Sequence, residues 1–153
     1  MKVRMILLTL AVLFSATVCL AQSPQMGTWK LNEEKSKFDP GASKNTTVVV
    51  EAVGDSVRVI VDGVDGGGRP IHSEWTGKID GKFYSVTGDP VSDERSYRQI
   101  SNRKWALAAK KNGKMTVTGS VLVSAKGNSR TVSASVTNTQ GKRVTSRAVY
   151  DKQ

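Results

Sequence analysis

The chain has 153 residues, with 23 Lys or Arg against 13 Asp or Glu, which gives a net charge of +10. This length fits one domain and excludes a multidomain protein. Behind the apolar N-terminal stretch no run is long enough to cross a membrane as a helix.

Residues 1–21 are predicted to be a cleaved secretory signal peptide. Lys2 and Arg4 give a charged start, residues 5–20 are mostly apolar, and Cys19-Leu20-Ala21 supplies small residues before a cut at Gln22. One alternative is lipidation of Cys19, the only cysteine, although Val18 fits the position before that cysteine poorly; an uncleaved anchor is another. We therefore expect a secreted or periplasmic domain at residues 22–153.

Cleavage changes the composition of the remaining domain. It leaves 21 basic and 13 acidic residues, a net charge of +8, and lowers the hydrophobic fraction from 38% to about 32%, which is thin for a solid core. Because Cys19 lies in the leader, the domain would have no thiol and no disulfide.

Short β-rich runs alternate with turn residues about every 8 to 12 positions from Gly27 onward, a spacing typical of all-β proteins. The polar stretch 32–45 is predicted to be a turn or at most one helical turn. Ten strands are predicted, at residues 27–31, 46–53, 56–62, 71–79, 82–87, 95–101, 105–111, 114–125, 129–139 and 143–151.

The predicted connections are hairpin-sized, which makes consecutive strands antiparallel neighbours. Asn112-Gly113 is the strongest turn signal, because this pair favours a type I′ turn. A flat meander of ten strands would leave open edges, so we expect the sheet to close into an up-and-down barrel.

Period-two alternation assigns slim apolar residues to the inner faces of three strands. A ten-strand barrel encloses more room than these side chains fill, which predicts either a cavity or a flattened barrel with collapsed walls. The predicted cavity wall consists of Ile71, Trp75, Ile79, Val117, Val121, Val132 and Val136.

Two segments carry a family resemblance. Gly27-Thr28-Trp29-Lys30-Leu31 resembles the start of calycin barrels, the superfamily of lipocalins and fatty-acid-binding proteins, and residues 147–152 resemble the last strand of fatty-acid-binding proteins. The resemblance implies that Trp29 plugs the closed end of the barrel. It also makes Arg147 a candidate for the residue stacked on Trp29 or for a carboxylate ligand.

The chain also departs from that family. Arg147 and Tyr150 are three positions apart, so on a regular strand they face opposite ways, whereas the family has an Arg-x-Tyr pair that points inward together. Residues 32–45 are too few for the two-helix lid of fatty-acid-binding proteins. The resemblance therefore implies a lidless, lipocalin-like bacterial domain.

The sequence offers little for catalysis or for metal binding. His72, the only histidine, lies on the polar face of its strand beside Glu74, and no motif places a nucleophile near it. The acidic residues Asp89, Asp93 and Glu94, and the stretch 62–66, are interpreted as surface loops. We expect no enzyme activity, no cofactor and no metal site.

Two functions are compatible with these features. The first is a monomeric binding protein that holds a small hydrophobic or amphipathic molecule, with an anionic, fatty-acid-like ligand as one option. The alternative is a non-catalytic envelope or surface protein whose basic exterior binds anionic partners. Nucleic acid is not expected, because exposed stacking aromatics are few.

Overall fold

The computed structural model describes residues 23–153, so the predicted leader and its cleavage site lie outside the described residues. The chain forms β1 (Gly27–Leu31), a 3-10 helix η2 (Glu33–Lys35) and the two-residue strand β2 (Lys37–Phe38). Nine further strands follow: β3 (Lys44–Val53), β4 (Ser56–Val64), β5 (Pro70–Gly77), β6 (Tyr84–Thr87), β7 (Glu94–Gln99), β8 (Lys104–Lys111), β9 (Lys114–Val123), β10 (Ser129–Thr137) and β11 (Arg143–Lys152).

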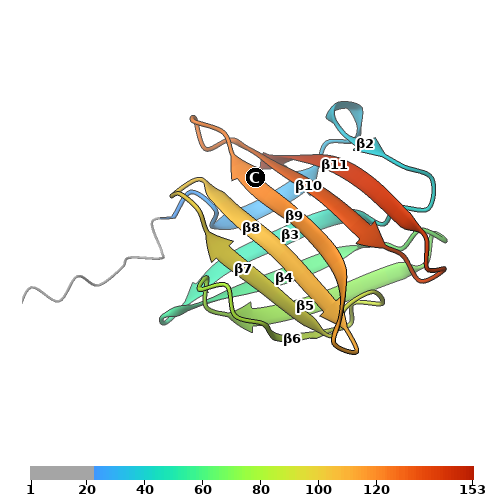
Figure 1. Cartoon of the computed structure of the whole chain (residues 1–153). Helices are drawn as coiled ribbons and strands as arrows, with labels where there is room; N and C mark the ends of the chain where they lie inside the picture. Colours follow the sequence, from blue (N-terminus) through green and yellow to red (C-terminus); the bar gives the residue numbers. More distant parts are fainter. Residues whose placement is uncertain (1–22) are drawn as a thin grey trace, which may run out of the picture.

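The strands form one antiparallel sheet in which β3 to β11 follow one another in chain order (Figure 1). The sheet closes because β1 pairs with both β3 and β11, while the short β2 adds only two residue pairs along β11. The predicted closed, up-and-down barrel of ten main strands is confirmed. The strand ends agree with the prediction to within two residues.

The segment between β1 and β3 is more structured than a simple turn. Asn32 caps η2 by accepting a hydrogen bond from the Lys35 backbone N–H, and β2 then pairs antiparallel with Ser146 and Arg147 of β11. This segment contains no α-helix, so the barrel has no helical lid.

The predicted hairpin turns form as expected. Asn112 has a φ of 50° and Gly113 a φ of 75°, which is the pair of positive angles that a type I′ turn needs. Asn112 is the only non-glycine residue with a positive φ in residues 23–153.

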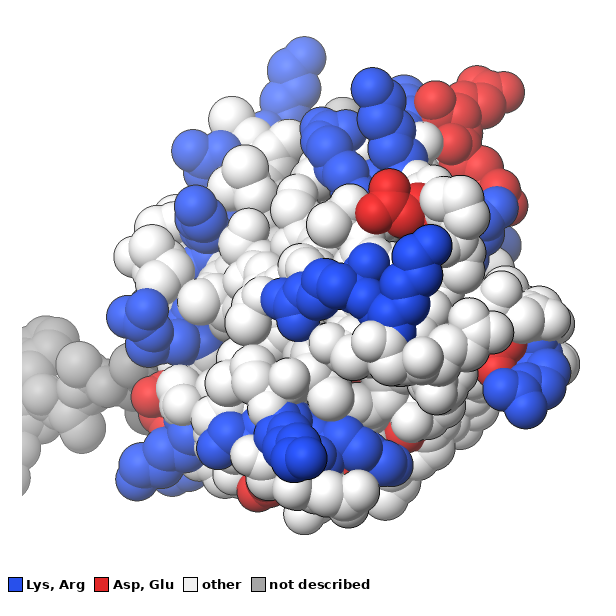
Figure 2. Space-filling view, turned by 45° about the vertical axis from the view of Figure 1, so that its right-hand side comes forward, with Lys and Arg blue, Asp and Glu red and all other residues white. Residues whose placement is uncertain are grey.

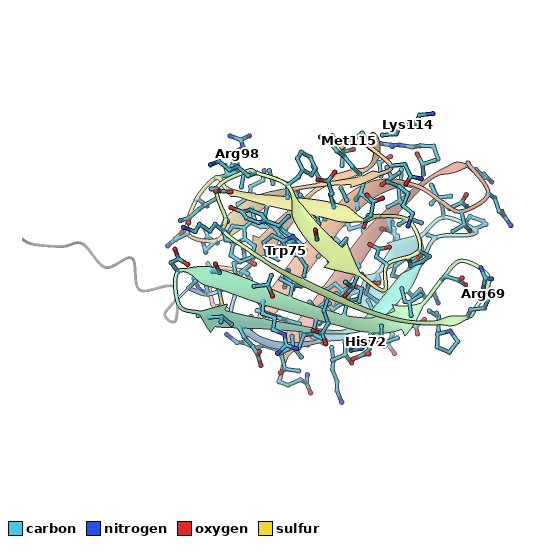
Figure 3. The ribbon with its side chains drawn as sticks, turned by 90° about the horizontal axis from the view of Figure 1, so that it is seen from below. Arg69, His72, Trp75, Arg98, Lys114 and Met115 are labelled. Carbon is cyan, nitrogen blue, oxygen red and sulfur yellow. The ribbon has the colours of Figure 1, made fainter. Side chains whose placement is uncertain are left out.

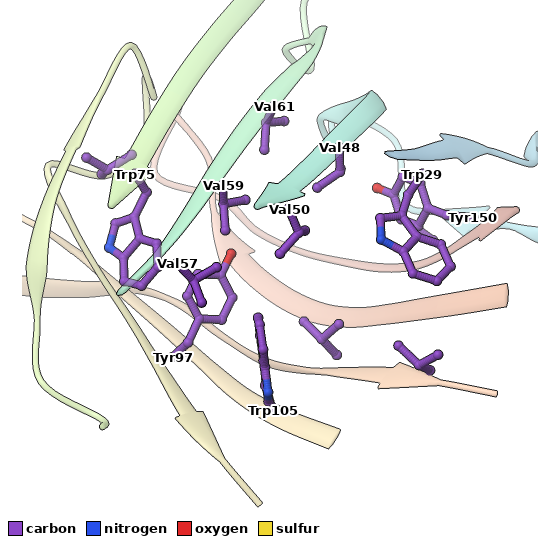
Figure 4. Packing of buried hydrophobic residues seen from close by; sticks show 14 residues of the cluster. Trp29, Val48, Val50, Val57, Val59, Val61, Trp75, Tyr97, Trp105 and Tyr150 are labelled. Atoms are coloured by element: carbon purple, nitrogen blue, oxygen red, sulfur yellow. The ribbon is translucent and has the colours of Figure 1, made fainter. Parts of the chain in front are cut away.

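Valines and aromatic residues fill the core (Figure 4). Val48 and Val50 of β3 lie opposite Val61 and Val59 of β4, in cross-strand pairs of the kind that stabilise a sheet. At one side of the core three rings meet edge to face, with centroids 4.9 Å apart for Trp75 and Tyr97 and 5.6 Å apart for Tyr97 and Trp105.

No helix within residues 23–153 is long and apolar enough to cross a membrane.

Candidate ligand-binding cavity

A cavity of about 130 Å³ lies inside the barrel. Its wall is mostly aliphatic and comes from nearly every strand, because alternate residues of each strand point inward. Five of the predicted wall residues line this cavity: Ile71, Val117, Val121, Val132 and Val136.

The other predicted residues lie elsewhere. Trp75 is buried in the aromatic cluster, where its Nε1–H donates to the Arg95 carbonyl at 2.9 Å, and Ile79 packs against the core. Neither lines the cavity: the β5 residues that do so are Ile71 and Ser73, which precede Trp75, and Ile79 follows the end of the strand. Figure 3 shows Trp75 inside the barrel and His72, on the opposite face of the same strand, outside it.

Trp29 is fully buried at the end of the barrel where β1 and β11 meet. Its Nε1–H donates to the Gln25 carbonyl at 3.0 Å. Two cations lie over its ring, the Lys152 ammonium at 5.1 Å and the Arg130 guanidinium at 5.9 Å from the centroid. Each contact contributes about 0.5–2 kcal/mol, depending on its desolvation.

Arg147 does not fill either role suggested for it. Its side chain is exposed on the outer face of β11, where Nη1–H donates to the Lys35 carbonyl at 3.4 Å. The reason is the strand period: Tyr150 is buried and lines the cavity, so a residue three positions earlier faces outward. Arg130 stands over Trp29 instead.

Arg130 is the unexpected residue of this site. It begins the inner face of β10, is 2% exposed and lines the cavity. Its Nε and Nη1 atoms are buried without a hydrogen-bond partner among residues 23–153. Burial lowers its pKa below the ordinary value, because removal from water destabilises the charged form.

A second inward arginine, Arg95 of β7, is compensated. Its Nη2–H donates to the Asp89 carboxylate at 2.8 Å, and both side chains are nearly buried. Ser92 also donates a hydrogen bond to Asp89. Burial acts to lower the pKa of Arg95, but the neighbouring Tyr97 and Asp89 more than offset it and raise that pKa.

Two tyrosines add hydroxyl groups to the wall. Tyr97 and Tyr150 are 4% and 2% exposed and both line the cavity. Burial raises the pKa of Tyr150 to about 12, so its hydroxyl stays neutral and able to donate a hydrogen bond at physiological pH.

Arg95 and Arg130 are not among the residues predicted to line the cavity. The alternation of faces along each strand could have identified them as inward-facing residues. Arg130 has the same parity as Val132 and Val136, and Arg95 has the parity of the buried Tyr97. They were not predicted to face inward because charged residues are rarely fully buried.

The open end of the barrel lies opposite Trp29. A smaller hollow there is formed by loops that contribute Gly41, Asp65, Arg69, Pro90 and Asn138, and it shares Ser43 and Val91 with the main cavity. The buried Asp65 fixes one of these loops by accepting hydrogen bonds from the Gly67 and Arg69 backbone N–H groups, both at 2.9 Å.

On the outer wall His72 forms an ion-pair cluster. Its Nδ1 lies 2.6 Å from Asp62 and its Nε2 lies 3.3 Å from Glu74, and Arg58 donates to Glu74 at 2.7 Å. In the part of the chain that the structure describes, no group of three or more His, Cys, Asp or Glu is arranged to hold a metal ion.

Comparisons with known proteins support the fold and no named family. No protein-family model matches the sequence, and no curated protein does. Solved structures match in shape: a redesigned β-barrel is 14% identical with a TM-score of 0.50, covering 89% of this chain and 97% of that chain.

Two further matches have lower scores. EF1p2_mFAP2b bound to DFHBI is 10% identical with a TM-score of 0.48, over 87% of this chain and 97% of that chain. A de novo designed fluorescence-activating β-barrel is 14% identical with a TM-score of 0.44, over 87% and 96%. At 14% identity the redesigned β-barrel shows the fold alone, and the calycin resemblance of the sequence stays a prediction.

Proposed function

We propose that this protein is a secreted or periplasmic, non-catalytic binding protein that holds one small hydrophobic or amphipathic molecule inside its barrel. The observation that carries the proposal is the 130 Å³ cavity, whose mostly aliphatic wall shares Ser43 and Val91 with the hollow at the open end. Such a concave, mostly apolar site with a few polar groups is the usual form of a small-molecule site.

The cavity volume limits the ligand. An engineered apolar cavity of about 150 Å³ accommodates benzene, so this barrel encloses a group of about six to eight non-hydrogen atoms. A longer chain would extend through the open end, past the loops that carry Ser43 and Val91. We therefore expect the affinity for alkyl compounds to stop rising once the chain fills the cavity.

Filling the cavity tests the proposal. Ala134 lines the cavity, and its neighbour Ser133 on β10 is exposed. Ala134→Phe should therefore abolish binding of 1-hexanol, measured by the ligand-induced rise in melting temperature. Ser133→Phe places the same ring on the outer wall and should bind hexanol as the unmodified protein does. Equal binding by the two variants would show that hexanol does not enter the barrel.

The natural cargo and the compartment are tested together. Native mass spectrometry of the protein purified from the envelope and culture fractions of its own host should show a stoichiometric adduct that is lost on denaturation. An N-terminus at Gln22 would establish cleavage of the leader, and an acylated Cys19 would establish the lipoprotein alternative. Recovery only from the cytoplasm would contradict secretion.

One observation favours a second candidate, in which the outer wall binds anionic envelope material. Between residues 95 and 150 the sequence has twelve Lys or Arg and no Asp or Glu. Arg95 and Arg130 face inward, and the rest lie on the outer face or in the turns of β7 to β11. Figure 2 shows one face of the molecule, on which Lys and Arg side chains cover more surface than Asp and Glu side chains do.

This second candidate makes a salt-dependent prediction. A one-sided positive surface attracts polyanions, and salt screens that attraction. The protein should be retained on vesicles of phosphatidylglycerol and released by about 0.5 M NaCl. Replacing three of the exposed cations, Lys114, Lys126 and Arg143, by Gln should weaken retention, whereas replacing Lys35, Lys44 and Lys78, which pair with acids, should weaken it less. Retention on the vesicles that does not change with the NaCl concentration would contradict this candidate function.

A further inference from the structure

We infer that Arg130 is the binding site for the head group of the cargo, and that the cargo is therefore a compact carboxylate whose charge neutralises this guanidinium. The inference rests on the proposed function, since it needs a ligand in the barrel. It goes further because it assigns the ligand's charge and the residue that recognises it.

The charges inside the barrel do not balance without a ligand. Five ionisable residues of the wall are buried or nearly so: Asp89, Arg95, Tyr97, Arg130 and Tyr150. Arg95 is neutralised by Asp89, and the Tyr150 hydroxyl stays neutral at physiological pH because burial raises its pKa. One positive charge therefore remains, on Arg130. A buried charge without a counter-charge is costly, and proteins pair such groups almost without exception.

The protein's own residues do not supply the missing partner. No described ion pair includes Arg130, and no acidic residue lies among the groups that influence its pKa. Gln25 Oε1 is the other buried side-chain atom without a partner in residues 23–153, but an amide oxygen carries no charge. The centroid of the Trp29 ring lies 5.9 Å from the Arg130 guanidinium carbon. This contact does not provide a hydrogen-bond acceptor for the Nε and Nη1 donors.

The geometry selects the kind of anion. The planar guanidinium fork matches the two oxygens of a carboxylate, and Tyr150 stands close enough to influence its charge. Because one positive charge is left over, a monoanion balances the interior, whereas a dianionic phosphate would leave a buried negative charge. The aliphatic wall from Val132 to Val136 then surrounds a short apolar tail.

The test compares ligands that share a tail and differ in charge. Isothermal titration of the purified protein at pH 7 would use hexanoate, 1-hexanol and hexyl phosphate. We expect hexanoate to bind at least about tenfold more tightly than hexanol and than hexyl phosphate, and to perturb tryptophan fluorescence because Arg130 lies over Trp29. The preference should survive about 0.5 M NaCl, since a buried pair is poorly screened.

Variants test whether the preference for hexanoate over hexanol depends on Arg130. Arg130→Gln should reduce the hexanoate-to-hexanol ratio to about one, and Arg130→Lys, which keeps the charge and loses the fork, should retain part of it. Arg147→Gln is the matched control, because it removes an exposed charge from the neighbouring strand, and it should keep the full ratio.

The outcomes separate the two proposals. Equal binding of hexanoate and hexanol by the unmodified protein overturns the role of Arg130 and leaves the binding protein intact. Binding of neither, with no adduct in the native protein, overturns the proposed function itself. If Arg130→Gln fails to fold, the ligand ratio of the unmodified protein and of Arg130→Lys still decides the question.

Discussion

Individual side chains inside this barrel differ in how their charge is compensated. Arg95 and Arg130 lie on the inner faces of β7 and β10, but only Arg95 has a carboxylate partner, Asp89. Asp89 also stabilises the loop before β7, since it accepts hydrogen bonds from the Val91 backbone N–H and from Ser92. One residue thus connects the stability of the fold with the electrostatics of the cavity.

Asp89→Asn should destabilise the protein by about 3 kcal/mol, because it leaves a second uncompensated guanidinium in the barrel. The exposed pair of Asp55 and Lys78 provides the contrast: Asp55→Asn should cost less than about 1 kcal/mol. Urea unfolding followed by circular dichroism measures both. Equal losses would mean that the Arg95 pair is better solvated than its burial indicates.

His72 predicts a pH effect on the outer wall. Its hydrogen bonds with Asp62 and Glu74 raise its pKa above 6.5, so the cluster stabilises the fold fully below the unfolded pKa of about 6.5. That contribution is lost as the pH rises through the higher folded pKa. As the chain has a single histidine, an NMR titration reads this pKa directly, and Asp62→Asn should lower it. An unchanged titration in that variant would exclude the pairing.

Among the elements, the β8–β9 hairpin shows how a local signal sets register. Asn112 and Gly113 supply the two positive φ angles of the turn, and eight residue pairs follow, with one bulge between Ala109 and Lys110. The bulge leaves Met115 exposed while Val117 remains inside. The predicted wall residues Val117 and Val121 therefore face inward, whereas Met115, which the strand period alone would place on the same face, does not.

Gly113→Val should destabilise the hairpin by about 1–3 kcal/mol, because a β-branched residue is strained at a φ of 75°. No atom would contact the added Cβ, so the loss would come from the backbone alone. Asn112→Gly at the adjacent position removes a side chain from a positive φ and should change the stability by less than about 0.5 kcal/mol. Thermal unfolding of both variants checks this, and a neutral Gly113→Val would contradict the turn geometry.

At the scale of the whole molecule, closure of the sheet depends on the short strand β1. Lys30 lies opposite Thr47 of β3 and Asp151 of β11, so this one position belongs to both ladders. Closure leaves no free edge among the main strands and so limits pairing between molecules.

Lys30→Pro should open this seam. It removes a backbone donor from the sheet at a residue whose side chain is exposed, so the loss of about 2 kcal/mol or more reflects the backbone. Lys30→Thr keeps the donor and should be nearly neutral. Unfolding curves with size-exclusion chromatography test the pair, and we expect aggregation of the proline variant. If the proline variant were as stable and monodisperse as the threonine variant, closure of the barrel would not depend on the backbone of Lys30.

Much of this architecture is determined by the sequence itself. Alternating valines, turn pairs such as Asn112-Gly113 and short connections are local features, and local geometry alone makes consecutive strands antiparallel. Five of the seven predicted wall residues followed from the same period of two, because parity along a strand fixes the face of each side chain.

The tertiary structure alone decided how the charged residues that face the cavity are compensated. Whether an inward cation is neutralised depends on what the barrel brings beside it, and Asp89 reaches Arg95 only through the fold of the β6–β7 loop. The sequence also could not show which cations lie over Trp29, because only closure of the barrel brings β10 and the end of β11 to this ring. Strand parity turns Arg130 inward and Arg147 outward, but only the packing of distant strands places Arg130 over Trp29.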